Sequence, residues 1–177
     1  MVQCWPFLRI ISIESCACLV KSVKLMNKNT ELFKLIPCFV NQIVFENHSD
    51  YIVGLLVDGM EDEIGIPLNN YDGSILTFVH SGCAEHAHIN TIHQILLKFM
   101  ENAGFDLEKV YIEAKYGDIT YCRLKWTKLD QSIYNVIGIG DALILHSLTA
   151  CDMVITQNVL KQFEKFDSSG YLDTYED

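Results

Sequence analysis

The chain has 177 residues and a mass of 20.2 kDa, the size of one domain. Half of its residues are hydrophobic and 20% are charged, which excludes an intrinsically disordered protein. The formal net charge is −10, so any nucleic-acid site has to be a local basic patch that overcomes an acidic background. No apolar run reaches the roughly 20 residues that a membrane-spanning helix needs, so we expect no membrane partner.

The seven cysteines include no CxxC pair, and several lie inside apolar runs. Cys38, for example, lies in an apolar run over residues 35–40. This pattern is typical of free, buried thiols in a reducing compartment. Because no small-residue cleavage site follows the N-terminal apolar stretch, we expect no export and a cytoplasmic location.

The first half of the chain predicts three strands and a helix. Residues 39–46 and 51–58 are rich in β-branched and aromatic side chains, which favours strands. Residues 63–68 predict a third, shorter strand. A polar loop follows, and Asp72 is expected to cap a helix over residues 74–81.

The clearest helix of the chain is predicted after Asn90, its expected cap, and ends at Gly104, where a glycine typically terminates a helix. Its apolar residues repeat at helical spacing and form one stripe: Ile92, Ile95, Leu96, Phe99, Met100 and Ala103.

The second half repeats the order strand, strand, strand, helix. A hairpin turns at residues 116–118, and a third strand, a helix, a short strand and a last helix follow. The predicted ranges are 109–115, 119–127, 133–139, 142–149, 153–155 and 158–166. We therefore expect an α+β fold with a bent, largely antiparallel sheet and helices packed on it. The predicted domain covers residues 37–166, between an N-terminal extension (1–36) and an acidic tail (167–177).

Histidines and other metal-binding residue types cluster between residues 80 and 93. His80, His86 and His88 are candidate ligands because neutral imidazole binds zinc and related metals. Their spacing matches no standard zinc pattern, so an exposed polar loop is the competing interpretation. His93 is a separate case, because it lies at the edge of the apolar stripe. It is either a hydrogen-bonded structural residue or a general base that lines a groove.

The predicted hairpin interleaves cations with aromatic residues on one face. Lys109, Tyr121, Arg123 and Lys125 alternate with apolar positions, so they could hold phosphates and stack bases. The competing interpretation is the solvated outer face of an antiparallel sheet.

Two glycines precede the predicted helix over residues 142–149, in Gly138-Ile139-Gly140-Asp141. Their backbone N–H groups could bind an anion at the helix N-terminus. Asp141 at the same end favours an internally capped helix instead.

These motifs occur in an order that resembles the bifunctional nuclease (BFN) domain family over residues 38–163. The segment Ile66-Pro67-Leu68 is similar to a family strand end, and Tyr121-Cys122-Arg123-Leu124 to a family hairpin. His93 matches the histidine of a family helix start. In the family's Ser-Arg-Pro-Ser-Asp-Ala signature the chain keeps Asp141.

The resemblance implies a nuclease that hydrolyses phosphodiester bonds in DNA or RNA. It implies that His93 acts as general acid or base and that Asp141 orients it or holds a divalent metal, whose requirement is left open. Arg123 and Lys125 are the residues expected to hold phosphates. The signature's Arg, Pro and second Ser are replaced by Gly138, Ile139 and Gly140.

Losing the arginine removes the cation best suited to a phosphate. A second hypothesis is therefore a non-enzymatic interaction module of the same fold, which could form a homodimer. A third hypothesis is a metal-binding regulator that uses the clustered histidines.

Overall fold

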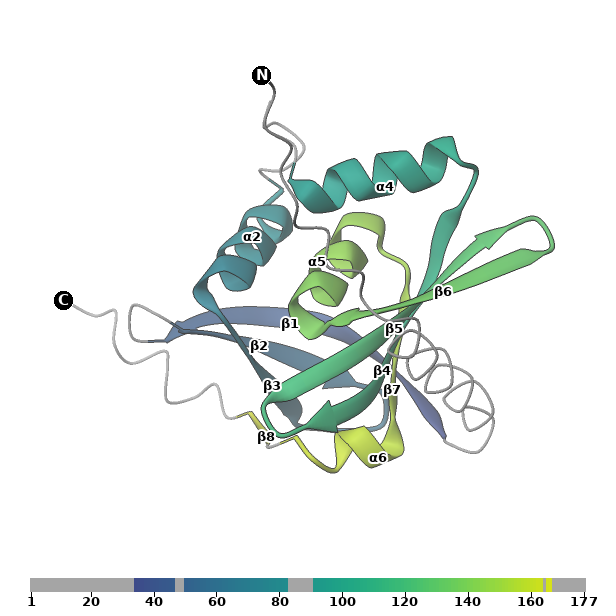
Figure 1. The fold of residues 1–177 in the computed structure, drawn as a ribbon. Helices are drawn as coiled ribbons and strands as arrows, with labels where there is room; N and C mark the ends of the chain where they lie inside the picture. The colour runs from purple at the N-terminus through teal and green to yellow at the C-terminus, as the bar shows by residue number, and fades with distance from the viewer. Residues whose placement is uncertain (1–33, 47–49, 83–90, 164, 167–177) are drawn as a thin grey trace, which may run out of the picture. The chain divides into compact units, whose positions relative to one another are not determined.

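We describe the fold from a computed structural model, in which residues 34–46, 50–82, 91–163 and 165–166 are described (Figure 1). The chain divides into two compact units, Met1–Lys34 and Leu35–Asp177, and every described helix and strand belongs to the second. No helix in these ranges is long and apolar enough to cross a membrane.

Over the described residues the chain forms eight strands and four helices. In chain order they are β1 (Leu35–Glu46), β2 (Asp50–Val57), β3 (Glu63–Leu68), α2 (Asn70–His80), α4 (Ile92–Asn102), β4 (Asp106–Tyr116), β5 (Ile119–Lys128), β6 (Gln131–Gly138), α5 (Ile139–Thr149), β7 (Asp152–Thr156), α6 (Gln157–Leu160) and β8 (Lys165–Phe166).

The strands form one sheet in the order β6-β5-β4-β7-β1-β2-β3-β8. All neighbouring pairs are antiparallel except β4 and β7, which run parallel. The protein therefore has an α+β fold with a largely antiparallel sheet, as the sequence predicts.

The two halves of the sheet are built alike. Strands β1, β2 and β3 form one antiparallel meander that leads into α2, and β4, β5 and β6 form a second that leads into α5. Strand β7 lies between the halves and pairs with β1 and β4. Helices α2 and α5 pack against each other, and each carries an aspartate, Asp72 or Asp141, three residues after its N-cap.

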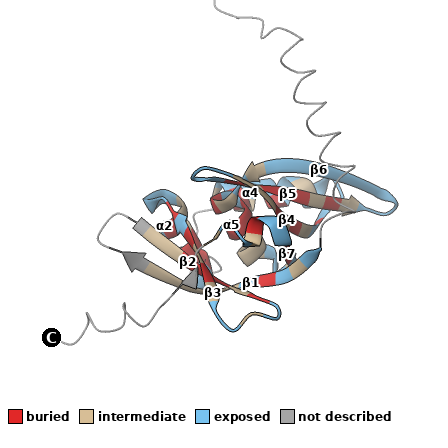
Figure 2. Cartoon of the chain, turned by 90° about the horizontal axis from the view of Figure 1, so that it is seen from below, coloured by how far each residue is buried: buried red, intermediate tan, exposed pale blue. Residues whose placement is uncertain are grey.

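The core lies between the sheet and these helices (Figure 2). On β5 the alternate residues Cys122, Leu124 and Trp126 are almost completely buried. Helix α5 contributes four consecutive buried side chains, Ala142–Leu145, so it is the central helix of the domain.

The structure corrects two predicted helices. Helix α2 begins at Asn70 because the Asn69 side chain accepts a hydrogen bond from the backbone N–H of Asp72. Asp72 is therefore inside the first turn and is not the cap. The last predicted helix is wrong beyond its first turn, since α6 ends at Leu160 and Lys165–Phe166 pair with β3 as strand β8.

Helix α4 lies where it is predicted, except that Thr91 and not Asn90 is its N-cap, and its apolar stripe faces outward. An amphipathic helix normally turns such a stripe to the core. Here Phe99 is 69% exposed and Ile92 is 63% exposed, whereas the buried residues of the helix are His93 and Leu97. The inward face of α4 thus brings a histidine to α5 and leaves the larger apolar face uncovered.

Candidate functional site

The imidazole of His93 and the carboxylate of Asp141 meet between α4 and α5. His93 Nε2 lies 2.9 Å from Asp141 Oδ1, although 47 residues separate the two in sequence. The roles expected for His93 and Asp141 require their side chains to approach each other, and they do. Their catalytic role stays a prediction.

A capping box fixes the turn that carries His93. Gln94 N–H donates to Thr91 Oγ1 at 3.3 Å, and Thr91 N–H donates to Gln94 Oε1 at 2.8 Å. These two bonds satisfy donors that a helix start otherwise leaves open. The first turn of α4 is thereby held in place, and His93 points inward from its second residue.

The pair has one buried and one exposed member. His93 is 4% exposed, whereas the Asp141 side chain is 54% exposed. An ionised carboxylate only accepts hydrogen bonds, so a neutral imidazole has to donate its Nε2–H to Asp141. The lone pair is then on Nδ1, which is buried and has no hydrogen-bond partner among the described residues.

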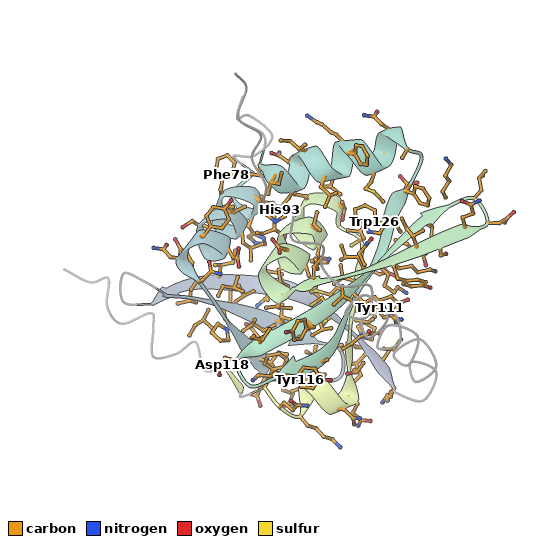
Figure 3. The ribbon with its side chains drawn as sticks, in the orientation of Figure 1. Phe78, His93, Tyr111, Tyr116, Asp118 and Trp126 are labelled. Carbon is orange, nitrogen blue, oxygen red and sulfur yellow. The ribbon has the colours of Figure 1, made fainter. Side chains whose placement is uncertain are left out.

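An open groove of about 430 Å³ adjoins the pair. Apart from His93 and Asp141, its lining is entirely apolar: Ile92, Ile95, Leu96, Phe99, Ile137 and Leu145. Figure 3 shows His93 among the helices, beneath α4 and beside α5. The groove therefore offers apolar contact, one carboxylate and one imidazole, and among the residues that the structure describes no Lys or Arg lines it.

Asp72 supports the helix turn on which Asp141 is carried. The Asn69 side chain donates to Asp72 Oδ2 at 2.7 Å, and this carboxylate lies against the backbone of Gly140. A β-carbon built on Gly140 would lie 2.2 Å from Asp72 Oδ2, so only glycine fits there without a shift. The Asp141 side chain contacts His93, which corrects the expectation that it caps its own helix.

The predicted nucleic-acid-binding residues lie on the other face of the sheet. Residues directly opposite each other on neighbouring strands share a face, and successive residues alternate. Cys122 pairs with Ile137, which lines the groove, so Arg123 and its partner Val136 point away from it. Arg123 and Lys125, which the resemblance expects to hold phosphates, therefore lie on the opposite face of the sheet from the groove of His93 and Asp141.

The cations of this outer face are paired with carboxylates. Arg123 Nη2 donates to Glu113 Oε1, and both side chains are buried, at 7% and 6% exposed. The Tyr111 and Tyr134 rings lie 4.9 and 5.1 Å from the guanidinium carbon. An arginine enclosed in this way is not presented to a phosphate, which corrects the solvated position that the sequence predicts.

The other three predicted residues also have partners. Lys125 Nζ donates to Glu108 Oε1, and Lys109 Nζ lies 3.2 Å from Asp152 Oδ2. The Tyr121 ring packs edge-on against Tyr116. The positive charge of the predicted stripe is therefore neutralised locally, and it gives the acidic chain little attraction for a polyanion.

Two pKa shifts follow from these pairs. Burial raises the pKa of the Glu113 carboxyl, and the attraction of Arg123 only partly offsets that increase. The hydrogen bond to Glu108 raises the pKa of Lys125. The free-energy cost of removing the Glu113 carboxylate from water therefore exceeds its attraction to Arg123.

Of the three candidate metal ligands, the structure describes one. His80 is exposed in the last turn of α2, whereas His86 and His88 lie outside the described residues. Over the parts of the chain that are described, no group of three or more His, Cys, Asp or Glu residues could hold a metal ion.

No protein-family model matches the chain, and no curated protein matches its sequence. The resemblance to the BFN domain therefore stands on the quoted motifs alone.

Proposed function

We propose that the protein is a BFN-like phosphodiesterase that cleaves DNA or RNA slowly and that uses His93 and Asp141. The observation that supports this proposal is their 2.9 Å contact at the edge of a groove. The resemblance singles out these two residues from the sequence, and helix periodicity alone gives no reason for them to meet.

The chemistry assigned to the pair is general acid–base catalysis. Asp141 holds the imidazole in the form that leaves Nδ1 unprotonated, so Nδ1 takes the proton of an attacking water. The resulting imidazolium is stabilised by the carboxylate and returns a proton to the leaving oxygen. Since Nδ1 is buried, this step requires the first turn of α4 to move enough to admit water.

In the described part of the chain, no positive side chain lines the groove to balance the phosphate. A divalent ion held by one carboxylate and the substrate phosphate, as Mg²⁺ commonly is, would supply that charge, and Asp141 is the exposed carboxylate of the groove. The proposed activity is therefore weak without added divalent ions.

The test is cleavage of labelled single-stranded RNA and DNA by the full chain, with Mg²⁺ or with a chelator. Removing a general base costs typically 10²- to 10⁴-fold, so we expect His93→Gln to lower the rate by at least about 100-fold. Glutamine retains a donor toward Asp141, so the packing of the pair is largely preserved. Asp141→Asn should lower the rate as well, because it no longer fixes the tautomer of His93.

Matched controls are His146→Gln and Asp152→Asn. His146 is a half-buried histidine that bonds the Cys151 carbonyl, and Asp152 is a surface carboxylate paired with Lys109. Both control variants should keep the wild-type rate. Cleavage that survives His93→Gln and Asp141→Asn unchanged in folded protein removes the proposed site.

The second candidate is a non-enzymatic interaction module that keeps the fold. It is favoured by the neutralised cations of the outer face and by the apolar walls of the groove. In that case His93 and Asp141 fasten α4 to α5. No RNA or DNA cleavage, together with a lower melting temperature for His93→Ala, would identify this second function.

A further inference from the structure

Strand β6 is an edge strand without the usual protection. It pairs with β5 on one side and is the last strand of the described sheet on the other. Its sequence, Gln-Ser-Ile-Tyr-Asn-Val-Ile-Gly, contains no charged residue and no proline. Edge strands are normally protected by charges, prolines or bulges, because their free N–H and C=O groups pair with another chain.

The edge is exposed along almost its whole length, as Figure 2 shows in pale blue. It continues into the outward stripe of α4, because Ile137 of β6 and four apolar α4 residues line the same groove. The name β6–α4 patch is used below for the exposed apolar side chains of α4 and β6 together. Ile92, Ile95, Leu96, Phe99 and Ile133 lie on the groove side of the sheet, and Tyr134 and Val136 lie on the opposite face of β6.

The area of the patch fits a modest but specific interface. The exposed parts of these side chains add up to roughly 600 Å² per protomer, so two protomers would bury about 1,200 Å², the lower end for stable complexes. Residues on both faces of β6 take part, as expected when a sheet is extended across its edge.

The net negative charge of the chain restricts where a second copy can bind. Two copies of a chain with a net charge of −10 repel each other over most of their surfaces. Strand β6 contains no charged residue, so two copies can approach along this edge with the least repulsion. A two-fold interface also has to match itself, and an uncharged antiparallel edge strand does so without any need for opposite charges.

We propose that the protein forms a homodimer in which β6 pairs antiparallel with β6 of a second copy. The eight-stranded sheets join into one continuous sheet, and the α4 stripes of the two copies cover the apolar surface next to the new strand pair. This proposal does not rest on cleavage by His93 and Asp141, although the α4 residues of the interface also line the groove beside that pair.

The test is the mass of the full chain across a concentration series, measured by analytical ultracentrifugation. We expect a dimer of twice 20.2 kDa for the wild type. Ile133→Lys on β6 and Phe99→Lys on α4 should each weaken the dimer by at least about tenfold in Kd, because each places two added lysines in one interface. Tyr71→Lys on α2 is the control, since this exposed side chain lies outside the patch and the charge change is the same.

Hydrogen exchange gives a second readout for the case that a variant unfolds. Backbone amides of β6 should become more protected in the wild type as concentration and dimer fraction rise. A monomeric wild type overturns the proposal and leaves the edge to a different protein. A dimer whose β6 amides exchange freely, or that Ile133→Lys and Phe99→Lys leave intact, also overturns it.

Discussion

Arg123 shows what a strand pattern reveals about a single residue. Alternation places it correctly on the face opposite to Cys122, but it does not tell whether that face is solvated. Glu113 and the Tyr111 and Tyr134 rings enclose the guanidinium. The available signal was Glu113, which alternation on β4 puts on the same face as Tyr111, the residue opposite Arg123.

We predict that Arg123→Met destabilises the protein by about 3–5 kcal/mol, because it leaves the Glu113 carboxylate buried without its partner. The double variant Arg123→Met/Glu113→Leu should recover most of this loss, since it removes both charges from the buried site. Urea unfolding followed by circular dichroism measures both effects.

Lys125→Met is the matched control, because its ion pair with Glu108 is exposed to solvent and should change stability little. A double variant as unstable as Arg123→Met alone would contradict the assignment of the cost to an unpaired charge.

His93 and Asp141 show what the residues alone do not reveal. Spacing puts His93 at the edge of the apolar stripe, and nothing local connects it to a residue in the next half of the chain. Only the order of motifs in which the chain resembles the BFN domain singles out this pair. The resemblance therefore contributes a contact that periodicity has no means to predict.

At the scale of elements, α4 shows the limit of helical periodicity. The pattern predicts the position of the helix, and the structure confirms it over Ile92–Asn102. Which face meets the domain depends on the neighbouring helices, and here the narrower face with His93 and Leu97 is the one that is buried. The outward stripe is therefore a surface that the sequence alone would assign to the core.

The packing of α2 against α5 depends on a glycine. We predict that Gly140→Ala destabilises the protein by about 1–3 kcal/mol, because the added methyl group overlaps the Asp72 carboxylate and either this carboxylate or α5 has to shift. The same shift would disturb Asp141, so cleavage activity should fall with stability.

Gly138→Ala is the control on the same turn. A β-carbon at Gly138 meets no atom within 4 Å, and its φ of −71° suits any residue, so the change should stay within about 0.5 kcal/mol. Equal melting temperatures for the two variants would show that the close approach of Asp72 to Gly140 does not affect stability.

At the scale of the whole molecule, the sequence predicts the order of most elements but not how the halves join. Strands β1 to β6 are predicted because adjacent strands connected by short turns leave a local pattern. The parallel pairing of β7 with β4 and the pairing of β8 with β3 leave none, since they join segments that are far apart in the chain.

The reactivity of the buried cysteines measures how often the assembled core unfolds. Burial raises the pKa of Cys38 to about 12 and also raises the pKa of Cys122, so neither forms the reactive thiolate near neutral pH. We predict that a maleimide labels both only as fast as the domain unfolds, and that it labels the half-buried Cys151 sooner. Peptide mass mapping of a labelling time course measures the order, and Cys122 reacting as fast as Cys151 would contradict it.

The position of β7 has a consequence for synthesis of the protein on the ribosome. The first meander can emerge and form its own pairs early, and so can the second, but the strand that stitches them together is made only after both. During that interval the strand edges of β1 and β4 that later pair with β7 have no partner in the nascent chain. Chaperone demand and misassembly should therefore peak just before residue 156 leaves the exit tunnel.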